Sequence, residues 1–171
     1  MKILFLDMDG VLNGQEWFEK NHAARIAFKN THGMGASDVQ FIHPLGHIDP
    51  DAVARLNCIC DAVDFKIVLS SSWRIIISLD DLRIALNHKR FKHVDRLIDV
   101  TPSLPLKSDE NRRGMEIKAW LDQHPDVTQY VVLDDDSFDI VKIHPHNFVH
   151  TNWRIGLTGL DVVHAISILS T

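Results

Sequence analysis

Short, continuous hydrophobic runs recur along the chain, and they are rich in β-branched and aromatic residues. The three strongest are KILFL at 2–6, FKIVL at 65–69 and YVVL at 130–133. Runs of this length and type are typical of parallel strands that are covered on both faces of a sheet. Two weaker runs, RLIDV at 96–100 and NFVH at 147–150, are further strand candidates. The pattern therefore predicts a buried parallel sheet.

Helical patterns with recognisable starts lie between these runs. Asp49 and Pro50 begin the first of them as N-cap and first helical residue, and Ser78 caps another. The expected helices cover residues 48–63, 78–89, 114–124 and 158–169. Strands that alternate with helices of this length form βαβ units. We therefore expect an α/β fold with a parallel sheet flanked by helices.

The segment that follows the first strand breaks this alternation. Residues 13–48 are polar and rich in Gly and His, and their one helical pattern is weak and runs over residues 15–29. We interpret this segment as a small cap or flap inserted after the first strand. The whole chain, residues 1–171, is then expected to form a single domain that contains this insertion.

Composition and charge narrow the range of partners. The hydrophobic fraction of 45% and the charged fraction of 24% are ordinary for a globular domain. A formal net charge of -5 gives no broad basic field for tight, nonspecific binding of nucleic acid. No apolar run approaches the roughly 18 residues of a membrane-spanning helix. We expect a soluble cytoplasmic protein with no membrane partner and no obligate protein partner.

Polar clusters follow each of the three strongest hydrophobic runs. Asp7 and Asp9 follow the first run, Ser70 and Ser71 the second, and the acidic stretch DDDSFD at 134–139 the third. In a parallel sheet these strand ends meet at one edge, where ligands bind. Clustered carboxylates repel one another unless a cation neutralises them, and oxygen ligands suit Mg²⁺ bound together with phosphate. The strand ends therefore predict a Mg²⁺ site for a phosphate ester.

This set of side chains predicts hydrolysis in two steps. Asp7 would attack phosphorus and form an aspartyl-phosphate, while Mg²⁺ would offset the repulsion between the two anions. Asp9 lies on the same side of an extended segment as Asp7, so it would protonate the leaving oxygen and then activate water. Ser70 would hold phosphoryl oxygens, and Gly10 would let the chain turn tightly behind the acid.

These motifs resemble those of the haloacid dehalogenase-like (HAD) superfamily of phosphohydrolases. DMDGV at 7–11 is similar to its first motif, IVLS at 67–70 to its second and VVLDD at 131–135 to its fourth. The resemblance implies a Rossmann-like fold. Haloacid dehalogenases proper lack the second aspartate of the first motif, so Asp9 favours phosphate chemistry.

The resemblance also implies roles for individual acids. Asp7 corresponds to the nucleophile and Asp9 to the acid/base. Mg²⁺ would be held by Asp7, the backbone carbonyl of Asp9 and Asp135. Either Asp134 or Asp139 would supply a further acidic contact, and the sequence leaves that choice open.

The third motif of the superfamily is a basic residue near the start of the helix that precedes the acidic strand. The stretch KSDENRRGMEIKAWL at 107–121 offers Lys107, Arg112, Arg113 and Lys118. Arg113 lies just before the expected helix and is the preferred candidate, followed by Lys107.

A narrower resemblance concerns the substrate. The stretches LSSSWR, NRRGMEIKAWL, YVVLDDDSFD and FVHTNWRIGLT together are similar to HAD domains of multidomain Swiss army knife RNA-repair proteins and to their stand-alone bacterial and phage relatives. This resemblance implies a nucleotide or a nucleic-acid end as the phosphomonoester substrate. The candidate substrate contacts are Ser71, Trp73, Arg74 and Lys107. Trp73 would stack on a base, and Arg74 would pair with phosphate or with an acidic neighbour.

Two other functions stay open at this point. One is phosphotransfer, as in phosphomutases of the same superfamily, although those usually carry a larger cap that excludes water. The other is a noncatalytic module that keeps the site to bind metal or phosphate. The presence of Asp7, Asp9 and Asp135 together favours hydrolysis, because degenerate modules normally lose one of the reactive acids.

Overall fold

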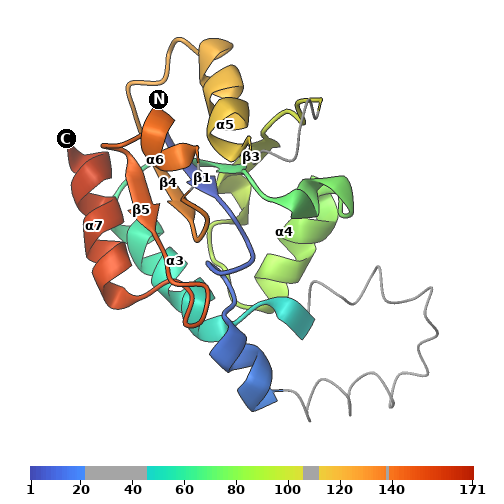
Figure 1. Cartoon of the computed structure of the whole chain (residues 1–171). Coiled ribbons are helices and arrows are strands. Elements are labelled where there is room, and N and C mark those ends of the chain that lie inside the picture. Colours follow the sequence, from blue (N-terminus) through green and yellow to red (C-terminus); the bar gives the residue numbers. More distant parts are fainter. Residues whose placement is uncertain (22–45, 106–111, 138) are drawn as a thin grey trace.

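The computed structural model describes residues 1–21, 46–105, 112–137 and 139–171. In this part of the chain five parallel strands form one sheet in the order β3-β2-β1-β4-β5 (Figure 1). The strands are β1 (Lys2–Leu6), β2 (Lys66–Leu69), β3 (Leu97–Val100), β4 (Gln129–Asp134) and β5 (Phe148–His150). All the predicted strands are present, which confirms the α/β, Rossmann-like sheet.

Helices lie between and after these strands, and α3, α4, α5 and α7 agree with the helices predicted over 48–63, 78–89, 114–124 and 158–169. They are α3 (Pro50–Ala62), α4 (Leu79–His88), α5 (Arg113–Asp122), α6 (Ile140–Ile143) and α7 (Gly159–Ser170), with short 3-10 helices η1 (Ser72–Ile75) and η2 (Val94–Arg96). Asp49 caps α3, accepting from the Asp51 N–H, and Ser78 caps α4. The sequence missed α6 because four residues are too few to show helical periodicity.

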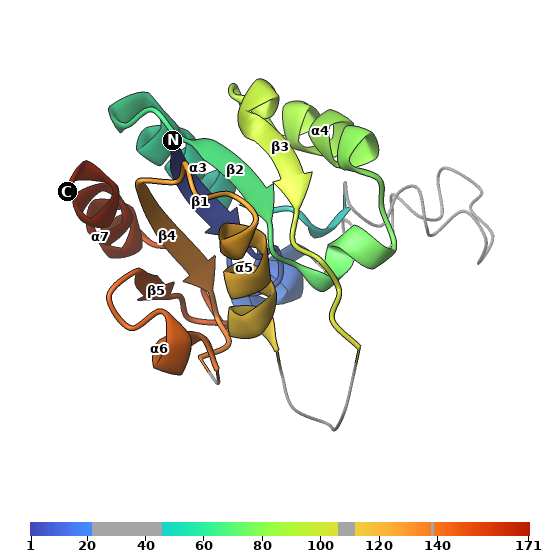
Figure 2. The same cartoon turned by 90° about the horizontal axis from the view of Figure 1, so that it is seen from above.

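The helices cover both faces of the sheet, which explains why its central strands are continuously hydrophobic. Leu4 and Leu6 of β1 share one core cluster with residues of α3, α4 and α7. Ile3 and Phe5 point the other way, into a smaller cluster with residues of α5 and α6. The two layers are visible when the sheet is seen from above (Figure 2). Every residue from Ile3 to Leu6 is therefore buried.

The register of the strands brings the ends of β1, β2 and β4 to one level. Leu6 lies opposite Leu69 on one side and Leu133 on the other. The hydrogen-bond ladder continues one step further, because the Asp7 N–H donates to the Leu133 carbonyl at 3.0 Å and the Ser70 N–H donates to the Leu6 carbonyl at 2.8 Å. The polar residues that follow these strands therefore meet at the carboxyl edge of the sheet.

The segment between β1 and α3 begins and ends at neighbouring places in the fold. Residues 15–21 are helical, which agrees with the start of the helix predicted over 15–29, and the rest of that helix lies outside the described residues. The rings of Phe18 and His47 meet edge to face, with centroids 5.1 Å apart. Residues 22–45 lie outside the described part, so the cap over 13–48 stays a prediction.

Within the described ranges, no helix combines the length and the apolar character that crossing a bilayer requires.

Candidate active site

Three carboxylates meet at the carboxyl edge of the sheet. Asp7 follows β1, Asp134 ends β4 and Asp135 comes directly after it. Each offers one carboxylate oxygen, and these oxygens all lie within 4.8 Å of one another. Asp7 and Asp134 are buried, and Asp135 is half-buried. The structure thus brings together three of the predicted metal ligands.

The burial of this acidic group changes the protonation of its members. Burial raises the pKa of Asp7 to about 6, although the Arg113 guanidinium and a hydrogen bond with Ser71 oppose the change. Burial, reinforced by the charge of Asp7, raises the pKa of Asp134 well above its usual range. Burial also raises the pKa of Asp135. Each shift means that the ionised group is costly here without a compensating cation.

Among the described candidates for the third motif, Arg113 reaches these acids. It is the first residue of α5, and its guanidinium lies 3.4 Å from Asp7 Oδ1 and 3.7 Å from Asp134 Oδ2. Lys118 instead pairs with Asp122 on the exposed side of the same helix. Lys107 lies outside the described residues. Of the described candidates for the third motif, the geometry therefore favours Arg113.

Asp139 is engaged elsewhere. Its two carboxylate oxygens accept from the backbone N–H groups of Gly114 and Met115, at 2.9 and 3.1 Å. This carboxylate caps the start of α5, where it also favours the positive end of the helix dipole. Asp134 Oδ2, by contrast, is buried and accepts no hydrogen bond from any described residue. The geometry therefore favours Asp134 over Asp139 as the additional acidic contact.

The serines that follow β2 face the same edge. Ser70 is fully buried, and its hydroxyl has no hydrogen-bond partner in the described part of the chain. A buried hydroxyl without a partner is rare in proteins and is a good candidate for binding a ligand oxygen. Ser71 hydrogen-bonds Asp7, and its oxygen accepts from the Trp73 N–H at 3.4 Å, which caps η1.

Asp9 lies outside the group of three acids, with its carboxylate held by two side chains. Asn13 Nδ2 donates to Oδ1, and the Trp73 indole N–H donates to Oδ2, each at 2.9 Å. Trp73 has only 3% of its surface exposed, which leaves little room for the base stacking that the sequence suggested.

Arg74 pairs with the acidic neighbour that the sequence analysis offered as its alternative to phosphate. Its guanidinium lies 2.6 Å from Glu116 Oε2 and also donates to the Ser71 carbonyl at 2.7 Å. The side chains of Arg74 and Glu116 are 7% and 12% exposed. This buried pair ties the loop after β2 to α5.

Sequence reasoning missed several residues that support the site. Asn13 and Glu116 are two of them. Two others lie at the end of β5. The Thr151 hydroxyl, directly after the strand, donates to the Gly10 carbonyl at 2.8 Å, and Nε2 of His150, the last residue of the strand, lies 2.8 Å from the Asp135 carbonyl. The signal for His150 and Thr151 was their place in the sequence, because the carboxyl end of a predicted parallel strand at 147–150 lies at the same edge as the other strand ends.

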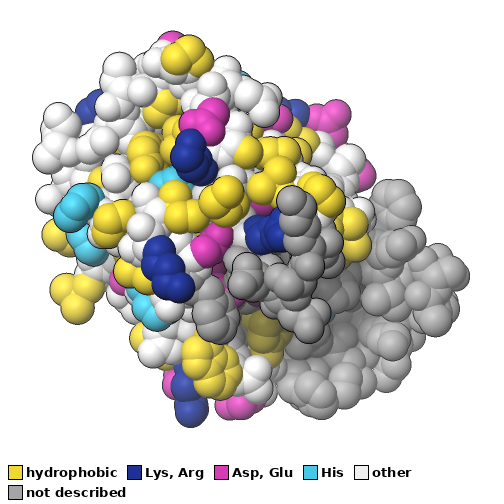
Figure 3. Space-filling model, turned by 45° about the horizontal axis from the view of Figure 1, so that its top comes forward, with side chains coloured by type: hydrophobic (Ala, Val, Ile, Leu, Met, Phe, Trp, Pro, Cys, Tyr) yellow, Lys and Arg dark blue, Asp and Glu magenta, His cyan; other side chains and the backbone are white. Residues whose placement is uncertain are grey.

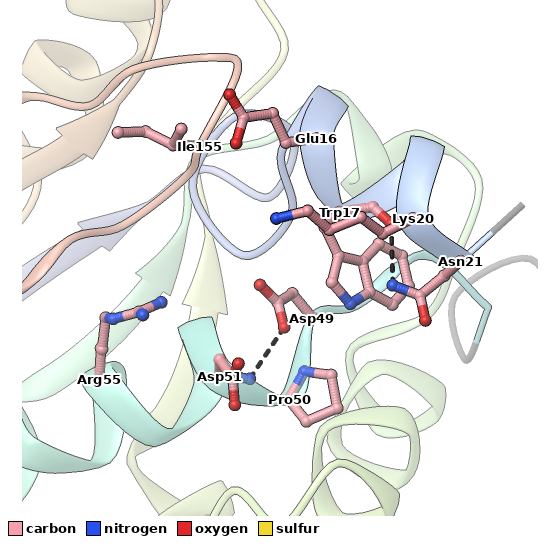
Figure 4. A pocket seen from close by; sticks show the side chains of 9 residues that line it. All are labelled: Glu16, Trp17, Lys20, Asn21, Asp49, Pro50, Asp51, Arg55 and Ile155. Atoms are coloured by element: carbon pink, nitrogen blue, oxygen red, sulfur yellow. Dashed lines mark hydrogen bonds between the residues drawn. The ribbon is translucent and has the colours of Figure 1, made fainter.

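A separate pocket of about 460 Å³ lies between the helical residues 15–21 and the start of α3 (Figure 4). Glu16, Asp49 and Asp51 give it negative charge, and Lys20 and Arg55 give it positive charge. None of the predicted site residues that the structure describes lines it. The chemistry that the sequence predicts therefore belongs to the carboxylate group and not to this pocket.

The fold and the site define the class of protein, namely a Rossmann-like α/β domain with a carboxylate centre at the carboxyl edge of its sheet. Residues 3–162 match the family described as the HAD domain in Swiss Army Knife RNA repair proteins. The chain therefore belongs to this family. Membership supports HAD-type phosphohydrolase activity in general, and this superfamily uses a divalent metal ion. No curated protein and no solved structure matches the chain.

Gly10 provides a test of how closely the first loop packs on the acidic group. Its φ is +68°, and an added Cβ would collide with the Asp135 side chain. Gly10→Ala should lower the free energy of unfolding by about 2 kcal/mol or more and weaken divalent-metal binding. Gly159→Ala, whose Cβ would enter open space, is the control and should stay within about 0.5 kcal/mol. Urea unfolding and calorimetric metal titration measure both effects, and equal behaviour of the two variants would contradict the packing.

The Arg74–Glu116 pair should be far more important for stability than an exposed pair on the same helix. Glu116→Gln leaves the buried guanidinium without its counter-charge and should cost about 3 kcal/mol. The control is Asp122→Asn, which breaks the pair with Lys118, whose side chains are 50% and 62% exposed; it should cost less than about 1 kcal/mol. Urea unfolding measures the free energy of unfolding of both variants. A similar decrease in the two would show that burial does not make the Arg74–Glu116 pair more important than the exposed pair.

The raised pKa of Asp7 predicts a specific pH dependence in metal-free protein. The folded-state value of about 6 exceeds the ordinary 3.8, so the folded state binds this proton more tightly than the unfolded state. The resulting stabilisation is complete below about pH 4 and is lost as the pH rises through 6, a loss of about 3 kcal/mol. Asp7→Asn should remove this part of the dependence. Urea unfolding in EDTA between pH 4 and 8 tests it, and parallel curves for the two proteins would refute it.

Proposed function

We propose that this protein is a Mg²⁺-dependent phosphohydrolase that cleaves a phosphomonoester through an aspartyl-phosphate on Asp7. The observation that carries the proposal is the group of buried Asp7 and Asp134 and half-buried Asp135, with their oxygens within 4.8 Å of one another and Arg113 beside them. A structural role gives no reason to gather two buried acids and one half-buried acid at the end of a sheet, because their mutual repulsion is costly.

The carboxylate oxygens of this group are suitable ligands for a divalent cation. Asp134 Oδ2 is buried and accepts no hydrogen bond from a described residue, and burial raises the pKa values of Asp7 and Asp135, so their ionised forms are costly without a nearby cation. Carboxylate oxygens are the ligands that Mg²⁺ prefers, and we assign these three acids, with the Asp9 backbone carbonyl, to hold it. When bound, the ion would reduce the repulsion between the nucleophile and the phosphate.

In the proposed first step, Asp7 attacks phosphorus and the bond to the ester oxygen breaks. Asp9 gives its proton to that leaving oxygen. The Ser70 hydroxyl, which has no partner in the described chain, donates to a phosphoryl oxygen, and Arg113 stabilises the charge that Asp7 and the phosphoryl group share. In the second step Asp9 takes a proton from water, which attacks phosphorus, breaks the bond to Asp7 and releases inorganic phosphate.

The proposed substrate is a nucleotide or a nucleic-acid end. Support comes from the family, which is described by its occurrence in RNA repair proteins. The net charge of -5 favours a small or terminal phosphate over a long polynucleotide. On the face shown in Figure 3, the Lys and Arg side chains of the described residues are scattered among acidic and hydrophobic ones, in agreement with that preference.

The test is phosphate release with Mg²⁺ and with EDTA from nucleoside monophosphates, oligonucleotides with 5′- or 3′-phosphates, and sugar phosphates. We expect metal-dependent release from the nucleotide or oligonucleotide class. Asp7→Asn should lower the rate by a factor on the order of 10³ or more, because it removes the nucleophile. The exposed Asp122→Asn variant serves as a matched control and should keep full activity.

Two results would replace this proposal with one of its alternatives. Binding of Mg²⁺ and phosphate without release from any ester would indicate a noncatalytic module. Formation of a new phosphate ester when an alcohol or nucleoside is added, at the expense of free phosphate, would indicate a phosphotransferase. Appreciable release by Asp7→Asn would exclude Asp7 as the nucleophile.

A further inference from the structure

Both carboxylate oxygens of Asp9 are held by side chains from different parts of the chain. Oδ1 accepts from Asn13 Nδ2 and Oδ2 accepts from Trp73 Nε1, both at 2.9 Å. A carboxylate oxygen has two lone pairs, so, as far as the described residues are concerned, one on each oxygen stays available to a substrate or a water molecule. The carboxylate thus has a fixed plane and still keeps positions for proton exchange.

The hydrogen-bond partners fix the orientation of the Asn13 amide. Its Oδ1 accepts from the Gly10 N–H at 2.9 Å, and a backbone N–H can only donate. Its Nδ2 faces the His47 carbonyl at 3.0 Å as well as Asp9, and a carbonyl can only accept. In the reversed orientation the amide N–H₂ would face the Gly10 N–H, and the amide oxygen would face two acceptors, Asp9 Oδ1 and the His47 carbonyl. Asn13, which is 2% exposed, therefore presents a donor to Asp9.

Trp73 is equally restricted in what it can offer. An indole N–H donates and cannot accept, so Asp9 Oδ2 must be the acceptor. The ring is 3% exposed and belongs to η1, which the Ser71 side chain caps directly after β2. Trp73 therefore reaches Asp9 from the same loop that presents Ser70 and Ser71.

We propose that Trp73 and Asn13 are positioning residues that hold Asp9 in the orientation in which it exchanges a proton with the leaving group. This inference rests on the proposed phosphohydrolase function. A general acid is effective only within hydrogen-bond reach of the atom that it protonates, and small displacements are costly. Asn13 also binds the His47 carbonyl, so the orientation of Asp9 is coupled to the place where the chain returns from the segment between β1 and α3.

The test uses kcat/KM for a series of phosphate monoesters, from nitrophenyl phosphates with good leaving groups to alkyl phosphates with poor ones. Trp73→Phe keeps the aromatic packing and removes the indole donor. It should lower kcat/KM for alkyl esters about tenfold more than for para-nitrophenyl phosphate, because only poor leaving groups need protonation. Asn13→Asp, which replaces the donor by an oxygen of similar size, should change the profile in the same direction.

Trp120→Phe is the matched control. Trp120 is also 3% exposed and its indole N–H donates to an aspartate, Asp99 Oδ2, at 2.7 Å. Losing this donor should cost similar stability and leave the dependence on the leaving group unchanged. If Trp73→Phe lowers all esters equally, as a merely structural loss would, the positioning role is overturned. If the unmodified enzyme releases phosphate from no ester, the proposed function fails and the positioning role fails with it.

A second measurement tests the Asp9–Trp73 contact without catalysis. In ¹H–¹⁵N spectra, the indole N–H signals of Trp73 and Trp120 are assigned with the two Phe variants. Asp9→Ala should shift the Trp73 signal and leave the Trp120 signal in place. A Trp73 signal that does not respond to Asp9→Ala would show that the contact is absent, and the positioning role would fall even in an active phosphatase.

Discussion

The common register of the three central strands is the constraint on which the site depends. Leu6 pairs with Leu69 on one side and with Leu133 on the other, so the chain leaves all three strands at one level. The next residues in each strand direction are an acid, a serine and an acid, and they have to share one edge. A slip of one residue would turn alternate side chains to the opposite face and separate the carboxylates. The chemistry of the edge is thus a consequence of hydrophobic pairing in the core.

Bringing the carboxylates together at one edge has an electrostatic cost, which Arg113 of α5 reduces. Asp7 and Asp134 are buried side by side, and their pKa values are raised because the charged forms lose water. Arg113 supplies part of the missing positive charge, and it can do so because α5 begins at this point. The start of α5 is held in turn by Asp139, which accepts from the N–H groups of Gly114 and Met115. Asp139, four residues after Asp135, therefore supports the site indirectly: it holds the start of α5, the helix that carries Arg113.

The sequence predicted the sheet, the main helices and the acids at the strand ends, because each leaves a local signal: a continuous hydrophobic run, a capping residue or a short motif. Apart from the short helix α6, its failures at the site concern contacts that only the fold creates. Trp73 and Asp9 are separated by 64 positions, and neither a hydrophobic pattern nor a motif indicates that an indole donates to that carboxylate. Arg74 and Glu116 are separated by 42 positions, and the charge of Arg74 alone is compatible with phosphate or with an acid. The choice between Asp134 and Asp139 likewise depended on backbone N–H groups that only the fold brings close.

Two consecutive residues of η1 connect the loop after β2, which carries Ser70 and Ser71, to two other parts of the site. Trp73 donates to Asp9 in the loop after β1, and Arg74 pairs with Glu116 of α5, which carries Arg113. The short helix η1 therefore contacts Asp9, follows directly on Ser70 and Ser71, and is linked through Glu116 to the helix that carries Arg113. A substitution in it changes stability and geometry together, so loss of activity alone cannot assign a role to either residue. Trp120, a buried tryptophan elsewhere, and the exposed Lys118–Asp122 pair on α5 separate the two contributions, because substitutions there lose the same kind of contact away from the acids.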